Sequence, residues 1–303
     1  MSGWTLFASS AFLTALLSCS AVSGGAETEQ GFHGNTVEIG EEFAPCDGCP
    51  AFIRVPQSPA DLRPITFVSK FELTWNNYWQ AVDAGACPAP ILGENFGRAI
   101  DLNERSELVA QLRLDWPIAE LNDAEIECYV AWLESVSGAD LALPTVQEWE
   151  WFASSGNPSR RFPWGDDIDP TREALSTRDL VGIPFASPWS GGRPSADIFP
   201  HVQGKRVGSF PPSEWGLYDV LGNVTELTEE RITAQNRSAY EDQFDFSNNP
   251  PQLEEALMKG YQIGQWSSPV WQDGIERTSR VSIYSYGFSA PVGIRLVIVG
   301  ERQ

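Results

Sequence analysis

Cysteines carry the most distinctive chemistry in this sequence, because their thiolates bind soft metals, attack electrophiles and form disulfides. The chain has five cysteines in 303 residues. They are Cys19, Cys46, Cys49, Cys87 and Cys128. Residues 129–303 therefore contain no thiol at all, so any metal or redox chemistry in the C-terminal half needs other side chains.

Cys46 and Cys49 are two residues apart, a spacing that suits a redox dithiol, half of a zinc site or a short disulfide. No second ligand pair with this spacing exists to complete a zinc site. Pro50 and an apolar, strand-like segment over 52–55 follow, whereas a thioredoxin-like motif would open a helix. We therefore expect structural disulfides, either Cys46 with Cys49 or pairings with Cys87 and Cys128.

Other catalytic groupings are missing from the sequence. Its two histidines, His33 and His201, lie far apart, which argues against a histidine-held iron or zinc centre. No Gly-x-Ser-x-Gly nucleophile elbow and no glycine-rich phosphate loop is present. The sequence thus offers no ordinary hydrolase or nucleotide-binding machinery.

The N-terminus reads as an export signal. Residues 4–18 are apolar but too short and too rich in serine and threonine for a permanent membrane span. The sequence Leu16-Leu17-Ser18-Cys19 resembles a bacterial lipobox, in which Cys19 would be lipidated; the alternative is ordinary cleavage near Ala21 or Ala26. We expect a signal peptide over 1–18, a flexible linker over 19–40 and one domain over 41–303, in the periplasm or lipid-anchored at the cell envelope.

The net charge and composition limit the kinds of molecule that this chain is expected to bind. Twenty basic and 41 acidic residues give a formal net charge of −21, which repels phosphate backbones and anionic lipids. We therefore expect no nucleic-acid partner, and no membrane contact except through an N-terminal lipid. With 42% hydrophobic residues, 26 glycines, 22 prolines and 12 tryptophans, the acidic chain should be a loop-rich globular domain pinned by aromatic side chains.

Local patterns predict three helices and several strands. Thr74 is a candidate N-cap for a short helix over 76–82, and Asn122 for a helix over 123–136 that ends at Gly138. Thr145 and Glu148 form a capping-box pattern ahead of an aromatic helix. Strands are expected over 52–55, 65–68 and 293–297.

The order of several motifs resembles the formylglycine-generating enzyme family, also called the sulfatase-modifying-factor family. The matching blocks are Glu72-Leu-Thr74 with Tyr78, Tyr129-Val-Ala-Trp-Leu133, 143–153, Pro163-Trp-Gly165, 207–227 and Gly293-Ile-Arg295. Together they cover about residues 41–300, and six blocks in the right order are far more specific than any one of them. The resemblance implies an α+β fold related to C-type lectins, loop-rich, with twisted antiparallel strands and a few short helices.

The resemblance also shows what this chain lacks. Active members of the family hold Cu(I) on two cysteines and oxidise a substrate cysteine to formylglycine. The corresponding stretch here, near Gln265, has no cysteine, and Gln265 and Asp273 are hard ligands that suit Cu(I) poorly. The sequence therefore argues against copper and leaves the catalytic residues unknown.

Calcium is the cofactor that the resemblance implies. One family site maps onto the carboxylates of Asp219 and Glu226 and the carbonyls of Gly222 and Val224. Carboxylate and backbone oxygens around a glycine-containing turn suit Ca²⁺, so we expect a structural calcium here. The alternative is that Asp219 and Glu226 are a capping residue and a surface acid.

Two functions from different classes remain open. The first is an exported, non-catalytic module that binds a protein or peptide or assists maturation. The second is an oxidoreductase of this family that matures a protein or small molecule through a different centre. The candidate groove residues are Trp266, Trp271, Arg277, Arg280 and Arg295. The arginines would either clamp a carboxylate or neutralise acids inside the fold.

Overall fold

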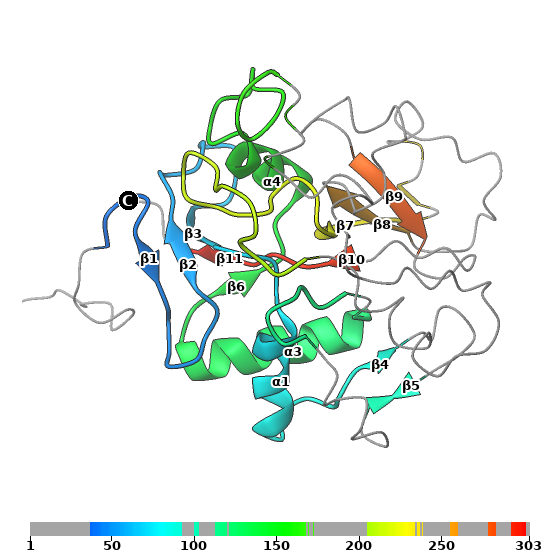
Figure 1. The fold of residues 1–303 in the computed structure, drawn as a ribbon. Coiled ribbons are helices and arrows are strands. Elements are labelled where there is room, and N and C mark those ends of the chain that lie inside the picture. The colour runs from blue at the N-terminus through cyan, green and yellow to red at the C-terminus, as the bar shows by residue number, and fades with distance from the viewer. Residues whose placement is uncertain are drawn as a thin grey trace, which may run out of the picture. The chain divides into compact units, whose positions relative to one another are not determined.

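Figure 1 shows the computed structural model of the chain. It describes residues 37–92, 100–102, 113–119, 121–167, 169, 172, 205–233, 235–236, 238, 255–259, 278–282 and 292–300. All of them belong to the second of two compact units, residues 32–303, so the expected signal peptide and Cys19 lie outside the described residues. Within these ranges, no helix has both the length and the apolar character needed to cross a bilayer.

A five-stranded antiparallel sheet forms the centre of this unit. Its strands, in spatial order, are β1 (Glu42–Phe43), β2 (Phe52–Arg54), β3 (Ile65–Ser69), β11 (Val297–Val299) and β6 (Leu141–Ala142). β11, the last strand in the described residues, therefore lies inside the sheet, where Val297 is opposite Val68 on one side and Ala142 on the other. The C-terminal end of the sequence thus completes the core built by the N-terminal strands.

A second sheet lies to the right of the five-stranded sheet in Figure 1. Its strands, in order, are β10 (Val292–Gly293), β7 (Thr225–Ile232), β8 (Glu255–Lys259) and β9 (Thr278–Ser282). β10 and β7 are parallel, and the other pairs are antiparallel. A separate two-stranded ribbon joins β4 (Ile91–Leu92) to β5 (Ile100–Asp101). The expected α+β fold with mainly antiparallel strands is confirmed.

The three predicted helices are also confirmed. They are α1 (Trp75–Asp83), α3 (Asp123–Ser137) and α4 (Val146–Ala153). Each begins with a complete capping box, in which the N-cap side chain and the N3 side chain bond each other's backbone N–H groups. Gly138 ends α3 at φ +70°, a left-handed conformation that glycine adopts without strain.

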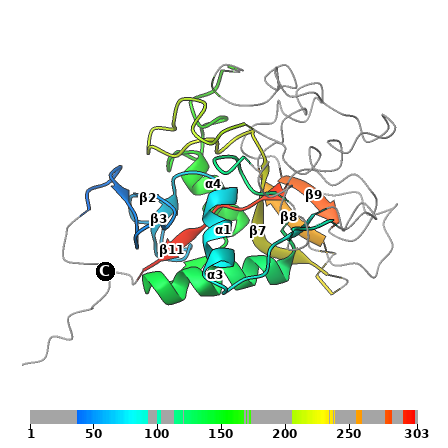
Figure 2. The same ribbon diagram turned by 60° about the horizontal axis from the view of Figure 1, so that its bottom comes forward.

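Different helices lie on the two faces of the five-stranded sheet (Figures 1 and 2), and each face contributes residues to a separate buried core. Phe52, Phe67 and Ile298 belong to the core that includes residues of α1 and α3, whereas their chain neighbours Ile53, Val68 and Val297 belong to the core that includes residues of α4. This alternation follows from the two-residue period of a strand. The sheet is therefore the middle layer, and α4 approaches it from the side opposite to α1 and α3.

The predicted continuous strand over 293–297 is wrong in its middle. β10 ends at Gly293 and β11 begins at Val297. Between them the backbone turns its carbonyls to other segments: Ile294 O accepts from Leu73 N at 2.8 Å, and Leu296 O accepts from Ser69 N at 2.8 Å. Because of this interruption, β10 belongs to one sheet and β11 to the other, and Arg295 lies in the segment that connects them.

Candidate functional site

Arg295 is at the centre of the most polar part of the interior. Its side chain and that of Glu226 in β7 are both 0% exposed, and the guanidinium Nη2 lies 2.7 Å from Glu226 Oε1. Arg295 Nε donates to the same oxygen at 2.9 Å. Burial lowers the pKa of Arg295, but the neighbouring carboxylates raise it further, so the net shift is upward and the guanidinium stays charged.

The remaining donors of Arg295 join distant segments. Nη1 donates to Ser69 O at 2.8 Å at the end of β3, and Nη2 donates to Tyr218 O at 2.8 Å. The second oxygen of Glu226 accepts from Trp149 Nε1 of α4 at 2.6 Å. One buried ion pair therefore connects β3, β7, α4 and the turn before β7, and its polar groups are well satisfied.

Two further acids lie beside this pair. Glu72 is 1% exposed, and its Oε2 accepts from Asn223 Nδ2 at 3.2 Å. Asp219 is also 1% exposed, and its Oδ2 accepts from Gly208 N at 2.6 Å. Burial, followed by the charge of Asp219, raises the pKa of Glu72 well above its usual value, and burial raises the pKa of Asp219 to about 6.

The turn that carries Asp219 needs the residue types found there. Asp219 has φ +52°, Gly222 +110° and Asn223 +59°, and left-handed backbone is tolerated best by glycine, asparagine and aspartate. The side chain of Asn223 connects the turn to a segment 18 residues earlier, since its Oδ1 accepts from Lys205 N at 2.7 Å. The left-handed backbone therefore accounts for the residue types at these three positions.

The expected calcium ligands meet this site only in part. Gly222 and Val224 lie in the turn with Asp219, but both oxygens of Glu226 are engaged by Arg295 and Trp149. Among the described residues, no three histidine, cysteine, aspartate or glutamate side chains converge in a way that would hold a metal ion by themselves. Both oxygens of Glu226 thus already accept hydrogen bonds from protein groups, and the calcium site stays a prediction.

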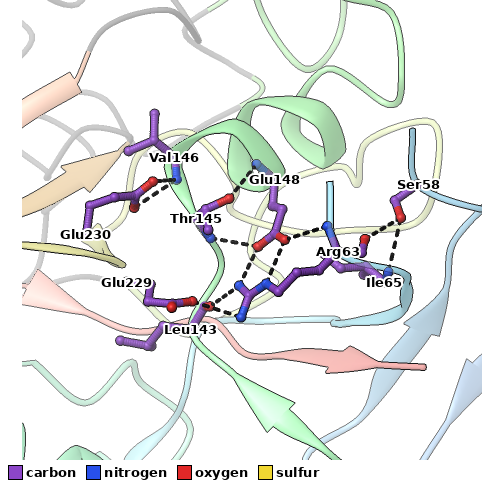
Figure 3. A network of polar contacts seen from close by, with 9 residues as sticks. All are labelled: Ser58, Arg63, Ile65, Leu143, Thr145, Val146, Glu148, Glu229 and Glu230. Carbon is purple, nitrogen blue, oxygen red and sulfur yellow. Dashed lines mark hydrogen bonds and ion pairs between the residues drawn. The ribbon is translucent and has the colours of Figure 1, made fainter. Parts of the chain in front are cut away.

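A second polar network fixes the start of α4, the helix that supplies Trp149 (Figure 3). Arg63 Nε donates to Glu148 Oε1 at 2.7 Å, and Glu148 Oε2 accepts from Thr145 N at 2.8 Å. Glu230 of β7 accepts from Val146 N at 2.8 Å. Carboxylates at this end of a helix also face the positive end of its dipole. The network joins β7 and the segment before β3 to α4.

This network predicts a pH dependence of stability. Although burial raises the pKa of Glu148, hydrogen bonds from Arg63 and from the helix start lower it more, so it lies below the ordinary 4.5. A depressed pKa gives stability that is present above the unfolded value and is lost as the pH falls through the folded value. We expect Glu148→Gln to cost about 1–3 kcal/mol at pH 7 and to flatten the loss of stability below about pH 4.5.

Urea unfolding of both proteins between pH 3 and pH 7, followed by tryptophan fluorescence, measures this effect. Glu214→Gln is the matched control, because it removes an acid that is 66% exposed and pairs with Arg160 at the surface. Equal stability losses on acidification in the wild type and in Glu148→Gln would show that the α4 network does not titrate with folding.

The structure pairs all four cysteines of the domain. Cys46 bonds to Cys49, with their Cα atoms 5.1 Å apart. Cys87 bonds to Cys128, with their Cα atoms 5.9 Å apart, and joins the segment after α1 to α3. Every cysteine in the described part of the chain is therefore in a disulfide, which resolves the alternatives that the sequence left open.

The expected groove residues do not assemble into a described site. Trp266, Trp271, Arg277 and the position near Gln265 lie outside the described residues, and Arg280 is described only as a backbone position of β9 opposite Leu257. Arg295 is buried and forms an ion pair with Glu226. This agrees with the second role that the sequence left open for the arginines, the neutralisation of acids inside the fold. The sequence reasoning missed Glu72 as a site residue, although it stands in the first matching motif block.

Comparison with known families decides the assignment. A family model described as the sulfatase-modifying factor enzyme 1-like domain matches residues 22–299. The chain belongs to this family. The formylglycine-generating enzyme of Bos taurus is 28% identical over 185 residues, which are 60% of this chain and 43% of that enzyme. The enzyme of Mycobacterium tuberculosis is 28% identical over 195 residues, covering 63% of this chain and 52% of the relative.

The relatives differ in activity. A Bos taurus protein named inactive C-alpha-formylglycine-generating enzyme 2 is 30% identical over 130 residues, which are 41% of this chain and 36% of that protein. The chain thus spans only about half or less of these curated relatives. Family membership alone therefore does not decide whether this domain is catalytic.

Solved structures confirm the fold. The structure of PvdO from Pseudomonas aeruginosa matches with a TM-score of 0.53 and 17% identity, covering 87% of this chain and 100% of that one. Treponema denticola variable protein 1 matches with a TM-score of 0.50 and 12% identity, covering 86% and 99%. At such identities the likeness concerns the sulfatase-modifying-factor fold and not its chemistry.

Proposed function

We propose that this chain is an exported sulfatase-modifying-factor-like domain that does not form formylglycine with copper and acts as a protein- or peptide-binding or accessory maturation module. One observation carries the proposal. The four cysteines of the domain are paired in two disulfides, and no cysteine follows Cys128 in the sequence. The thiolate pair on which the family's copper chemistry depends is thus missing from its position.

The chemistry of Cu(I) explains why this loss matters. Cu(I) is a soft ion that selects thiolate and thioether ligands, and a disulfide sulfur carries no negative charge to offer it. The second half of the chain contains one methionine, Met258, and otherwise offers amide, carboxylate and a single imidazole group. Without two thiolates, activation of oxygen at a copper centre has no ligand set.

The similarity to an inactive relative supports this reading, since a family member can keep the fold without the activity. Export is supported by the apolar residues 4–18 and by the lipobox-like end at Cys19. Two disulfides also suit an oxidising compartment outside the cytoplasm. A module fixed by disulfides and carrying an excess of acidic residues is suited to binding other exported proteins or peptides.

The test uses the full chain expressed in a bacterial host. Fractionation and N-terminal mass analysis of the mature protein are expected to give an envelope protein that begins at a lipidated Cys19 or near Ala21 or Ala26. The mature protein, without reduction, is then incubated with Cu(I), oxygen and a cysteine-containing sulfatase peptide, beside an active family member as positive control. Mass spectrometry is expected to find the peptide unchanged.

Two results would contradict the proposal separately. A chain that keeps Met1 and stays in the cytoplasm contradicts export. Conversion of the peptide cysteine to formylglycine contradicts the loss of copper chemistry and returns the oxidoreductase alternative. Conversion that persists without copper would point to a different centre within the same fold.

A further inference from the structure

The Cys46–Cys49 disulfide lies in the loop that joins β1, the edge strand of the five-stranded sheet, to β2. The two residues between the cysteines, Asp47 and Gly48, are exposed, and the cysteines themselves are only partly buried. Thiol–disulfide exchange needs an attacking thiolate to reach one sulfur, so access decides which disulfides react in a folded protein. This disulfide is open to such an attack without unfolding of the sheet.

Other contacts hold the loop in place when the crosslink is absent. The flanking strands β1 and β2 pair with each other. At the end of the loop, Ala51 O accepts from Lys70 N at 2.8 Å. The disulfide closes a separation of only three residues, so it restricts the unfolded chain little. A crosslink that adds little to folding is in turn little protected by the fold, and it is reduced more readily.

The loop also keeps its two thiols together after reduction. Gly48 has φ +77°, and a Cβ at this position would lie 2.8 Å from Gln80 Oε1, so a side chain of α1 lies directly against the loop. The Cα atoms of Cys46 and Cys49 are 5.1 Å apart. A loop fixed in this way holds the second thiol next to the first, so the pair can close again by attack on a mixed disulfide.

The two cysteines differ in how they are covered. Cys49 packs against the apolar core that includes residues of α1 and α3. Cys46 lies on the other side of the exposed residues Asp47 and Gly48. Attack from solvent is therefore expected at Cys46, with Cys49 as the leaving thiolate.

The Cys87–Cys128 disulfide provides an internal comparison. Cys87 is 6% exposed and belongs to the same apolar core. This crosslink joins residues 41 apart, so its loss frees a much longer part of the chain. Thiols that reduce an accessible disulfide in the folded protein should therefore leave Cys87–Cys128 intact.

We propose that Cys46 and Cys49 are a redox-active pair that oxidises two cysteine thiols of an exported polypeptide. A client thiolate attacks Cys46 Sγ, the Cys46–Cys49 bond breaks, and Cys49 leaves as a thiolate. The second client thiol then attacks the client sulfur of the mixed disulfide, which closes the client disulfide and releases Cys46. The client loses two electrons and two protons, and the cysteine pair gains both. This step is the chemistry of the proposed accessory maturation role and rests on it for the export of its clients.

Charge limits the choice of client. Asp47 stands between the two cysteines, and the whole chain has a net charge of −21. Acidic segments are repelled by such a surface, and basic segments are attracted to it. The expected clients therefore carry lysine or arginine beside their cysteines.

The test incubates the mature protein, purified without reductant, with a peptide that carries two reduced cysteines flanked by lysines. Oxygen is excluded, so the disulfides of the protein are the only oxidant. Alkylation with a maleimide at intervals, followed by mass spectrometry, identifies the free thiols. We expect one peptide disulfide per chain and new thiols at Cys46 and Cys49, with Cys87–Cys128 reduced at least about tenfold more slowly. A glutamate-flanked peptide should react several-fold more slowly at low salt.

Serine variants are the controls. Replacing both Cys46 and Cys49 should abolish oxidation of the peptide, and tryptophan fluorescence checks that this variant is folded. Cys49→Ser, which leaves Cys46 free, should form a mixed disulfide with the oxidised peptide at least about tenfold faster than Cys46→Ser. Peptide oxidation that persists in the double variant overturns the proposal, as does a wild type whose Cys46–Cys49 disulfide survives the reduced peptide. Equal rates for the single variants overturn Cys46 as the attacked sulfur.

This assay contains no copper and no sulfatase sequence. Its failure would therefore leave the proposed export and the proposed loss of copper chemistry standing. Formation of formylglycine by the protein, in turn, would not alter a positive result for disulfide exchange.

Discussion

Replacing Arg295 with methionine is expected to lower the free energy of unfolding by about 3–5 kcal/mol, because Glu226 would be left as a buried charge without its partner. Arg295 is 0% exposed and donates to Glu226 and to the backbone carbonyls of Ser69 and Tyr218 in other segments. The interior would also lose the only positive charge that the described residues bring to Glu72 and Asp219. Urea unfolding at neutral pH, followed by tryptophan fluorescence, measures the change.

The double variant Glu226→Gln with Arg295→Met is the informative control. The double variant has no charge at either position, so neither side chain is left as a buried ion without its partner. It should therefore be more stable than Arg295→Met alone. Glutamine at 226 also keeps an acceptor for Trp149 Nε1. A loss below about 1 kcal/mol for Arg295→Met would show that the ion pair does not hold the two sheets together.

Removal of the Cys87–Cys128 disulfide is expected to be the second large effect. Its cysteines are 41 residues apart, so the crosslink restricts the unfolded chain by about 4 kcal/mol in the loop-entropy account. The Cys46–Cys49 disulfide has a separation of three residues and should contribute only about 2 kcal/mol. Replacing each pair with serines and comparing urea unfolding curves measures both contributions.

The two double-serine variants control each other, since each removes one disulfide and the same number of sulfur atoms. The turn over 46–49 also keeps its backbone hydrogen bond, from Cys49 N to Cys46 O at 3.1 Å, when the disulfide is lost. A larger loss from the short crosslink than from the long one would contradict this ranking. It would then follow that the turn ahead of β2 organises the edge of the sheet.

The helices were predictable because their signals are local. Thr74, Asn122 and Thr145 each bond a backbone N–H three residues ahead, so cap and helix start lie within one short window of sequence. Gly138 likewise ends α3 through its own backbone conformation. No distant contact is needed to read such patterns.

The polar interior was not predictable in the same way. Arg295 and Glu226 are 69 residues apart, and Glu72 and Asn223 are 151 residues apart, so no local pattern reveals that they meet. The apolar residues around Arg295 indicated a continuous strand over 293–297. The strand is interrupted because Ile294 O and Leu296 O accept hydrogen bonds from Leu73 N and Ser69 N, and not from a single neighbouring strand. The disulfide pairing was open for the same reason, since spacing alone allows several connections.

The proposed absence of copper chemistry in this chain depends on the state of its cysteines. A competition titration of Cu(I) between a chromophoric chelator and the unreduced mature protein tests this most directly, with a parallel thiol count under denaturing conditions. With both disulfides of the domain intact, the protein should take no Cu(I) from the chelator, and any thiol found should belong to Cys19 alone. Stoichiometric capture of Cu(I) by two free thiols would contradict the account and restore thiolate copper chemistry to this protein.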